Sequence, residues 1–356
     1  MQARTLSFST LGLIAGCGCT PAAVGSSEPG PTVGATSTRP TSAWVKDSPF
    51  AGEAPPEGAV DSVVLPDGTF VVAQSYASEA EPFVLLTGKK GALSKSKAPW
   101  TCAGGPAEID VSGTSLWGHC MGLEAAPRIH FWHSADLGKT WTPVGVLDGA
   151  VALGSYALAG DTLFVTGKFA GQTARLHVFS RESTGKFSRR SAKETLGWPD
   201  DMQTAVAAAP DGRTIALLGL AKSGEVWIAA STDGGSTLRS LWRGAPTATS
   251  PMFGASIEDE VLTFLVQQDS GPSGVGKIAL AEGKTPNVSV SHFPSEAEDA
   301  CVYGSHVAVQ LKGGTWAMSS DAGASFVNVP APRAEELAAL ECSASGARYG
   351  SQVLAW

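Results

Sequence analysis

The sequence has few charged residues, no long apolar run and almost no stretch that is typical of a long helix. Aspartate, glutamate, lysine and arginine together make up 16% of the 356 residues, and the formal net charge is −8. A nucleic-acid surface needs a basic stripe that neutralises phosphates, so this balance argues against nucleic-acid binding. The apolar stretch Leu6–Ala15 is too short to span a bilayer.

Motifs that carry chemistry are also scarce. The sequence contains no Gly-x-Ser-x-Gly elbow, no phosphate-binding P-loop and no Cys-x-x-Cys pair. His130 and His133 are three residues apart, a spacing that points them to opposite faces of a strand, so a shared metal is not predicted. We therefore expect neither a metal nor a cofactor.

Glycine and short apolar segments are what the sequence has in quantity. There are 42 glycines, and hydrophobic residues make up 43% of the chain, enough for a substantial core. Serine, threonine and valine are common. This composition predicts many short strands joined by tight turns.

The first 43 residues predict a leader followed by a tether. Ile14-Ala15-Gly16-Cys17 ends the apolar stretch and resembles the lipobox of bacterial lipoprotein signal peptides, in which the cysteine is lipidated. We expect residues 1–16 to be the signal peptide, Cys17 the lipidation site, and residues 17–43, rich in Pro, Gly, Ser and Thr, a flexible tether. Gly18 after the cysteine suggests the outer membrane by resemblance to enterobacterial sorting rules. An ordinary secretory signal is the alternative.

A short motif recurs through the rest of the chain. It reads SADLGKTW at Ser134–Trp141, STDGGSTL at Ser231–Leu238 and SSDAGASF at Ser319–Phe326. Its aspartates at 136, 233 and 321 are 97 (233 − 136) and 88 (321 − 233) residues apart. Each gap is about twice the length of a four-stranded propeller blade. Units without the motif are therefore expected between units that have it.

Strand–turn–strand patterns fill those gaps. They predict six complete units that begin near residues 58, 106, 149, 200, 250 and 297. Residues 340–356 look like the first two strands of a seventh unit, whose missing outer strand could come from Thr41–Phe50. Closure by both termini removes free sheet edges. We predict an all-β fold over residues 44–356, a single propeller of four-stranded antiparallel blades, with seven blades favoured over six.

The four cysteines of this part predict disulfides, since an exported chain can keep them. Cys102 and Cys120 have a hairpin-like separation, and Cys301 and Cys342 lie one repeat apart. We predict the pairs Cys102–Cys120 and Cys301–Cys342, with the other connectivities left open.

The repeated motif resembles the Asp-box, or BNR repeat, of the sialidase-like propellers. The resemblance implies a structural role at the turn between the third and fourth strands of a blade, on the face opposite the usual ligand site. An aspartate can accept several backbone N–H bonds at such a turn, and glycine can take a positive φ. The structural positions are Ser134, Asp136, Gly138, Thr140, Trp141, Ser231, Asp233, Gly235, Thr237, Ser319, Asp321, Gly323, Ser325 and Phe326.

Sialidases also carry an arginine triad, a tyrosine–glutamate nucleophile pair and an aspartic acid/base. The first inner strand, within Gly58–Gln74, has no arginine to clamp a substrate carboxylate. Tyr303 as nucleophile, Glu298 beside it and Asp61 as acid are the only candidates for such a site. A divergent sialidase-like exo-glycoside hydrolase is therefore the alternative prediction.

Acidic residues gather where one blade leads into the next. In a propeller these crossovers lie on the face where ligands usually bind, so a ring of carboxylates there would attract cations or basic partners. Solvated loop residues in an acidic protein are the simpler interpretation. The binding-face candidates are Asp61, Glu108, Asp110, Asp200, Asp201, Glu298 and Asp299.

The prediction for function is a non-catalytic cell-envelope lipoprotein. Its membrane contact would be the lipid anchor alone, and its propeller would bind a protein or glycan partner. Asp-box propellers without catalytic residues, such as photosystem assembly factors and sortilin-type receptors, are binding platforms, which is an analogy at the level of the fold.

Overall fold

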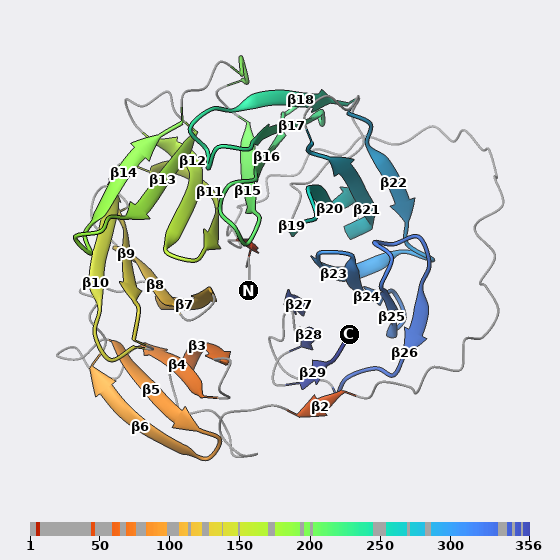
Figure 1. Cartoon of the computed structure of the whole chain (residues 1–356). Coiled ribbons are helices and arrows are strands. Elements are labelled where there is room, and N and C mark those ends of the chain that lie inside the picture. The colour runs from red at the N-terminus through yellow and green to blue at the C-terminus, as the bar shows by residue number, and fades with distance from the viewer. Residues whose placement is uncertain are drawn as a thin grey trace, which may run out of the picture.

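Seven antiparallel sheets form a ring, seen along its axis in Figure 1. The structure is a computed structural model. It describes residues 5–7, 44–46, 59–64, 69–75, 83–97, 107–112, 115–122, 128–136, 138–148, 150–169, 175–192, 196–199, 202–244, 254–268, 271–281, 286–333, 340–343, 346–349 and 352–356. Within these residues, none forms a helix long and apolar enough to cross a membrane.

Blades 1 to 6 follow one another along the chain, and each pairs its strands in sequence order from the inner to the outer edge. Blades 1, 2 and 3 contain β3 (Ala59–Val64), β4 (Phe70–Ser75), β5 (Phe83–Lys89), β6 (Ala92–Lys97), β7 (Ala107–Ser112), β8 (Ser115–Gly122), β9 (Arg128–Ser134), β10 (Thr142–Asp148), β11 (Ala150–Ala159), β12 (Thr162–Phe169), β13 (Leu176–Arg181) and β14 (Phe187–Ser191). Blades 4, 5 and 6 contain β15 (Gln203–Ala208), β16 (Ile215–Leu220), β17 (Val226–Ser231), β18 (Arg239–Arg243), β19 (Ala255–Glu258), β20 (Val261–Gln268), β21 (Gly271–Ala279), β22 (Ser289–His292), β23 (Ala297–Tyr303), β24 (His306–Leu311), β25 (Thr315–Ser319) and β26 (Val327–Val329).

Blade 7 is built from both ends of the folded chain. Its three inner strands, one more than the sequence pattern predicted, are β27 (Leu340–Ser343), β28 (Gly346–Tyr349) and β29 (Gln352–Leu354). Its outer strand is β2 (Val45–Lys46), with Val45 opposite Val353. This confirms the predicted seven blades and the closure by an N-terminal strand, and the six-bladed alternative is wrong. The inner strand of blade 4 begins at Gln203, three residues after the predicted start near residue 200. The inner strand of blade 5 begins at Ala255, five residues after the predicted start near residue 250.

Blade 3 carries a fifth strand, β1 (Thr5–Ser7), on its inner edge. Leu6 lies opposite Tyr156 of β11 in an antiparallel pair. Residues 5–7 belong to the predicted signal peptide. Removal of that peptide would leave β11 as the inner edge of blade 3, as the first strand is in the other blades.

The core lies between neighbouring blades rather than at the centre of the ring. A middle strand is covered on both faces by other sheets, so its sequence is apolar without alternation. β16 shows this most clearly, because all six residues of Ile215–Leu220 are buried. Ala216 and Leu218 pack toward blade 5, whereas Ile215 and Leu217 pack toward blade 3. The apolar side chains of a blade are thus buried by packing against the two neighbouring blades.

Two contacts hold the closure. The indole of Trp44 packs edge-on against Trp316 at 5.4 Å, and its Nε1 donates to the Pro330 carbonyl at 2.7 Å. A disulfide joins Cys301 of β23 to Cys342 of β27, with the Cα atoms 5.4 Å apart, so it links the inner strands of blades 6 and 7. This pair confirms the predicted one. Cys120 is also disulfide-bonded, and the predicted partner, Cys102, lies outside the described residues.

We expect removal of the inter-blade disulfide to loosen the ring at its closure. The bridge spans 41 residues, and loss of such a cross-link costs about 3–4 kcal/mol, chiefly by freeing the unfolded chain. Purified Cys301→Ala/Cys342→Ala should melt roughly 5–10 °C below the parent chain in circular dichroism. An unchanged melting temperature would mean that the closure does not depend on the bridge.

Candidate functional site

The first motif copy forms a turn in which both carboxylate oxygens of the aspartate accept hydrogen bonds. It joins β9 to β10 in blade 2. Asp136 Oδ1 accepts from the Ser134 hydroxyl and the Thr140 N–H, both at 2.8 Å, and Oδ2 accepts from the Thr140 hydroxyl at 2.6 Å. The Gly138 N–H donates to Ser134 Oγ at 2.8 Å with φ at 88°, and Trp141 Nε1 donates to the Gly138 carbonyl at 3.1 Å.

The other two copies bond in the same way, between the third and fourth strands of blades 4 and 6. Each aspartate accepts from the preceding serine hydroxyl and, four residues later, from an N–H and a hydroxyl at 2.6–2.9 Å. These bonds join Asp233 to Ser231 and Thr237, and Asp321 to Ser319 and Ser325. The repeated network fixes the end of every second blade.

The acidity of these carboxyls fits that structural role. Burial alone would raise the pKa of Asp136 and Asp233, but the hydrogen bonds outweigh it and lower both to about 2. A carboxyl that stays ionised above pH 2 is a poor general acid at neutral pH. The turns therefore hold strands together.

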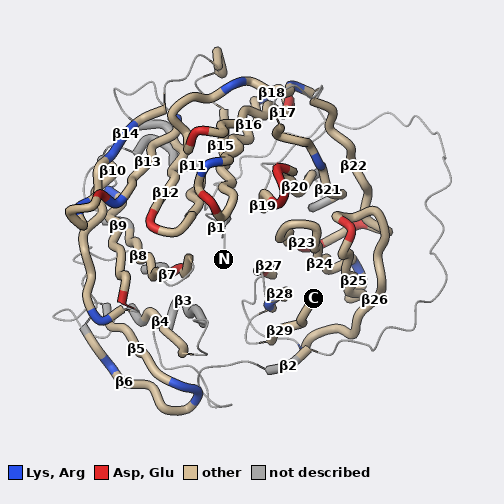
Figure 2. The backbone as a smooth tube through the Cα atoms, in the orientation of Figure 1, with Lys and Arg blue, Asp and Glu red and all other residues tan. Residues whose placement is uncertain are grey.

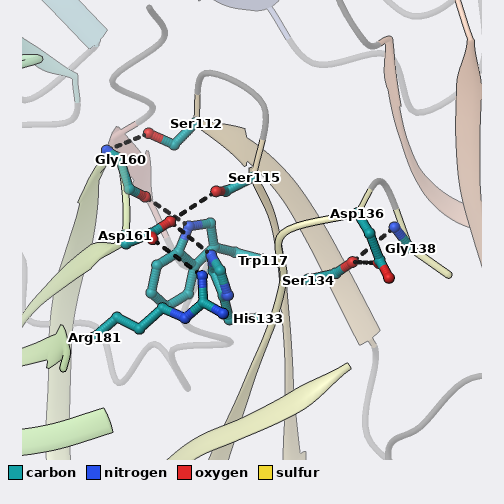
Figure 3. A network of polar contacts seen from close by, with 10 residues as sticks. All are labelled: Ser112, Ser115, Trp117, His133, Ser134, Asp136, Gly138, Gly160, Asp161 and Arg181. Atoms are coloured by element: carbon teal, nitrogen blue, oxygen red, sulfur yellow. Dashed lines mark hydrogen bonds and ion pairs between the residues drawn. The ribbon is translucent and has the colours of Figure 1, made fainter. Parts of the chain in front are cut away.

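A second polar cluster, shown in Figure 3, joins blades 2 and 3 on the same face of the ring as the Asp136 turn. Asp161 lies in the turn between β11 and β12. Its Oδ1 accepts from the Ser115 hydroxyl at 2.8 Å and lies 3.0 Å from His133 Nε2, while Arg181 Nη1 lies 3.4 Å from Oδ2. The Asp161 side chain is 43% exposed and that of His133 only 1%.

Backbone bonds complete this junction. The Gly160 N–H donates to Ser112 Oγ at 2.8 Å, and Trp117 Nε1 donates to the Gly160 carbonyl at 3.2 Å. Blades 5 and 6 repeat the first of these bonds, since the Gly304 N–H donates to Ser256 Oγ at 2.9 Å. The cluster therefore elaborates a general way of joining adjacent inner strands.

The serine, histidine and aspartate of this cluster do not form a catalytic triad. Ser115 and His133 both bond to the same aspartate oxygen, and in the described part of the chain they share no hydrogen bond with each other. A nucleophile needs its base within hydrogen-bond reach. Burial lowers the pKa of His133, against the opposing effect of Asp161. The imidazole is therefore neutral near pH 7, and the cluster joins two blades.

Asp110, expected at the ligand-binding face, is buried between blades 2 and 3. Its side chain accepts a hydrogen bond from the Tyr156 hydroxyl of the neighbouring blade, and the residue is 1% exposed. His119 packs against the Tyr156 ring at 5.0 Å. Burial lowers the pKa of His119 to about 4, although the charge of Asp110 opposes the shift.

The other acidic candidates are dispersed. Asp299 accepts from the backbone N–H groups of Ala300 and Leu340 at 2.8 and 3.2 Å, and burial raises its pKa. Glu298 is exposed and accepts from Gln310 Nε2 at 2.9 Å. Asp61 and Glu108 lie in β3 and β7, but their side chains, like Asp200 and Asp201 altogether, lie outside the described residues.

The glycosidase candidates on β23 are not brought together. Glu298 and Tyr303 stand near opposite ends of the strand, five residues and therefore roughly 17 Å apart at a rise of about 3.3 Å per residue. Burial, with the charge of Glu258, raises the pKa of Tyr303. A phenol shifted in that direction is less ready to act as a nucleophile.

One surface group was not singled out from the sequence. At one edge of blade 4, the Arg243 guanidinium lies over the Trp227 ring, 4.2 Å from its centroid. It also makes a two-point ion pair with Glu225, with Nη2–Oε2 at 2.7 Å and Nε–Oε1 at 3.1 Å. Trp198 meets Trp227 edge-on at 6.2 Å. We call these four residues the tryptophan–arginine edge.

This edge lies away from the motif turns. Glu225 and Trp227 are at the start of β17 and Arg243 is at the end of β18, whereas the Asp233 turn joins the other ends of the same strands. It is thus on the face where each blade leads into the next.

Figure 2 shows basic residues near β18 and β14, and acidic ones at the turns β11–β12 and β19–β20. The sequence signal was weak, because tryptophans recur in most blades as core.

Comparisons with known proteins assign no family to this chain. The sequence matches no protein-family model and no curated protein. Among solved structures, it is similar to YCF48 from Cyanidioschyzon merolae (12% identity, 81% of this chain and 90% of that one, TM-score 0.49). It is also similar to the periplasmic gluconolactonase PpgL of Pseudomonas aeruginosa, with 13% identity over 82% of this chain and 88% of that one and a TM-score of 0.48. BamB from Moraxella catarrhalis is similar at 12% identity over 84% of this chain and 86% of that one, with a TM-score of 0.45.

The buried histidine of blade 2 should make the protein acid-sensitive. Unfolded His119 binds a proton below about pH 6.5, but in the fold its pKa is about 4. The unfolded state therefore holds more protons between these values, and stability falls as pH falls, by up to about 3 kcal/mol from this group. His119→Phe should flatten the dependence of urea unfolding on pH between 4.5 and 6.5. His292→Gln, at an exposed histidine of β22, is the matched control, and equal slopes in all three proteins would contradict the expectation.

Proposed function

We propose that the chain is a non-catalytic cell-envelope lipoprotein whose propeller is a binding platform, with the tryptophan–arginine edge as its contact surface. The observation that carries this proposal is the exposed, ion-paired Arg243 stacked on Trp227. Its side chain is 56% exposed. Tryptophan and arginine are the residues that most often dominate binding at protein surfaces, because they combine a large contact area with directed hydrogen bonds.

Rigidity supports the same proposal. The motif turns fix strands within a blade, and the Ser–Gly bonds and the inter-blade disulfide hold neighbouring blades in a fixed relation. A surface that is already ordered loses little entropy when it binds. The uniform bonding of the three turns also supports their assignment to the Asp-box class.

The proposed location follows from the N-terminal residues and from cysteine chemistry. The lipobox-like sequence at Cys17 would attach the chain to a bacterial envelope, with the outer membrane as the proposed site. The disulfide between blades 6 and 7 supports an oxidising compartment outside the cytoplasm. The proposed partner is a protein or a glycan of that envelope.

The lipid anchor can be tested by labelling. Cells that express the chain with a C-terminal tag are grown with radioactive palmitate, and the tagged protein is isolated. The wild-type chain should carry label and sediment with membranes, whereas Cys17→Ser should carry none and appear in the soluble periplasmic or medium fraction. Label retained in Cys17→Ser would place the modification elsewhere, and no label in either would remove the lipoprotein assignment.

The binding role can be tested without the anchor. Full-length Cys17→Ser protein is mixed with washed envelopes of the producing cells, and association is measured by co-sedimentation. We expect saturable binding that Arg243→Ala weakens about tenfold, because the variant removes both the stacked cation and the ion pair. Lys139→Ala, an exposed change at the Asp136 turn on the other face, should bind like the parent. Equal binding by both variants would remove the proposed contact surface.

A further inference from the structure

We propose that the tryptophan–arginine edge recognises a neutral glycan through a hexopyranose unit, an inference that rests on the binding role proposed above and names its ligand class. Three features of the edge carry it: a planar, partly exposed ion pair, an aromatic wall, and a buried indole donor for which the described residues supply no partner.

The ion pair offers the groups that recognise a vicinal diol. Arg243 uses Nε and Nη2 on Glu225, so its Nη1 donors have no partner within the described part of the chain. The Glu225 carboxylate also interacts with Ser223 and Trp227, and its side chain is 24% exposed, so a ligand hydroxyl competes with these neighbours for its oxygens. Two adjacent hydroxyls of a pyranose each donate and accept, so they match a donor and an acceptor held side by side.

The aromatic wall gives the apolar contact that a pyranose ring also requires. Trp227 is half-buried beneath the guanidinium, and Trp198 stands across it at an interplanar angle of 78°. A pyranose has C–H groups on its ring faces and hydroxyls around its rim, and an indole is likewise apolar on its face and polar at one edge. The two kinds of surface are therefore complementary.

Trp198 is the second, independent observation. The residue is only 7% exposed, and its Nε1 has no hydrogen-bond partner within the described residues. A buried donor left unpaired costs on the order of 1–3 kcal/mol. Because Nε1 itself is buried, a sugar hydroxyl, or a water fixed by the sugar, satisfies it once neighbouring side chains move aside on binding.

The ring of Trp198 is held in place by its surroundings. Arg175 Nη2 donates to the Trp198 carbonyl at 3.0 Å. A Cβ added to Gly219 would lie 2.7 Å from Cζ3 of Trp198, so the indole rests directly on a strand position that only glycine leaves open. The unpaired donor is thus fixed before any ligand arrives.

Charge selects a neutral glycan over an acidic one. Glu225 already balances Arg243, and the whole chain carries a formal charge of −8. A uronic or sialic acid carboxylate would meet an Arg243 guanidinium already neutralised by Glu225, and it would be repelled by the overall field. Neutral hexoses do not suffer this repulsion.

The test uses full-length Cys17→Ser protein and separates the glycan from a protein partner. Envelopes are treated with periodate, which cleaves vicinal diols, or with protease, and co-sedimentation is repeated. Isothermal titration is run with cellohexaose, laminarihexaose, maltohexaose and mannohexaose, and with 3′-sialyllactose as the acidic probe. We expect periodate to abolish the association that Arg243→Ala weakens, protease to leave it, and neutral hexoses to bind better than sialyllactose.

Trp198→Phe is the discriminating variant, because it keeps an aromatic ring and deletes the unpaired donor. We expect neutral-hexose affinity to fall about tenfold, whereas the melting temperature falls by only a few degrees, because the smaller ring leaves a small cavity against Gly219. Trp242→Phe changes the residue of β18 next to Arg243 and is the matched control. It should bind neutral hexoses as tightly as the parent protein does.

The outcomes are distinguishable. Association that survives periodate but not protease would overturn the glycan and leave a protein-binding platform. Preference for sialyllactose, or unchanged affinity in Trp198→Phe, would also overturn this inference. Association that no edge variant alters would overturn both this inference and the proposed function.

Discussion

Face-to-face packing between sheets, closed into a ring, is the constraint on which the rest of this structure depends. No blade has a core of its own, because side chains such as Leu217 and Leu218 point from one sheet into the two neighbouring ones. Such packing leaves a first and a last sheet exposed unless the ring closes. The chain meets this requirement with β2, a strand of two residues from the N-terminal side, and with a disulfide between blades 6 and 7.

Most polar side chains that look chemical in the sequence serve this ring. Asp136 and its two counterparts fix the outer strands, Asp161 and His133 join blades 2 and 3, and Asp110 is bonded to Tyr156 of the next blade. Their acceptor capacity is used within the protein. The tryptophan–arginine edge differs, because its ion pair lies over an aromatic ring on the face where each blade leads into the next, and it joins two strands of a single blade.

Features that depend on the spacing of repeats were predicted well from the sequence. Features that depend on contacts between residues far apart in the chain were predicted poorly. The spacing of Asp136, Asp233 and Asp321 predicted the length of a blade, and the strand patterns between and after them predicted seven blades. The one-repeat separation predicted the Cys301–Cys342 bridge. The burial of Asp110 was missed, because its partner is 46 residues away and belongs to another sheet. The tryptophan–arginine edge was missed for a similar reason, since Trp198, Trp227 and Arg243 meet only after a crossover and two strands have packed.

The participation of β2 in the last blade has a consequence for biosynthesis. Val45 emerges from the ribosome 308 residues (353 − 45) before its partner Val353. The ring therefore cannot close until β29 has been made, and a chain that has not reached that strand keeps at least one unpaired blade face. Until then the nascent chain presents open sheet edges, which are templates for strand addition by another chain.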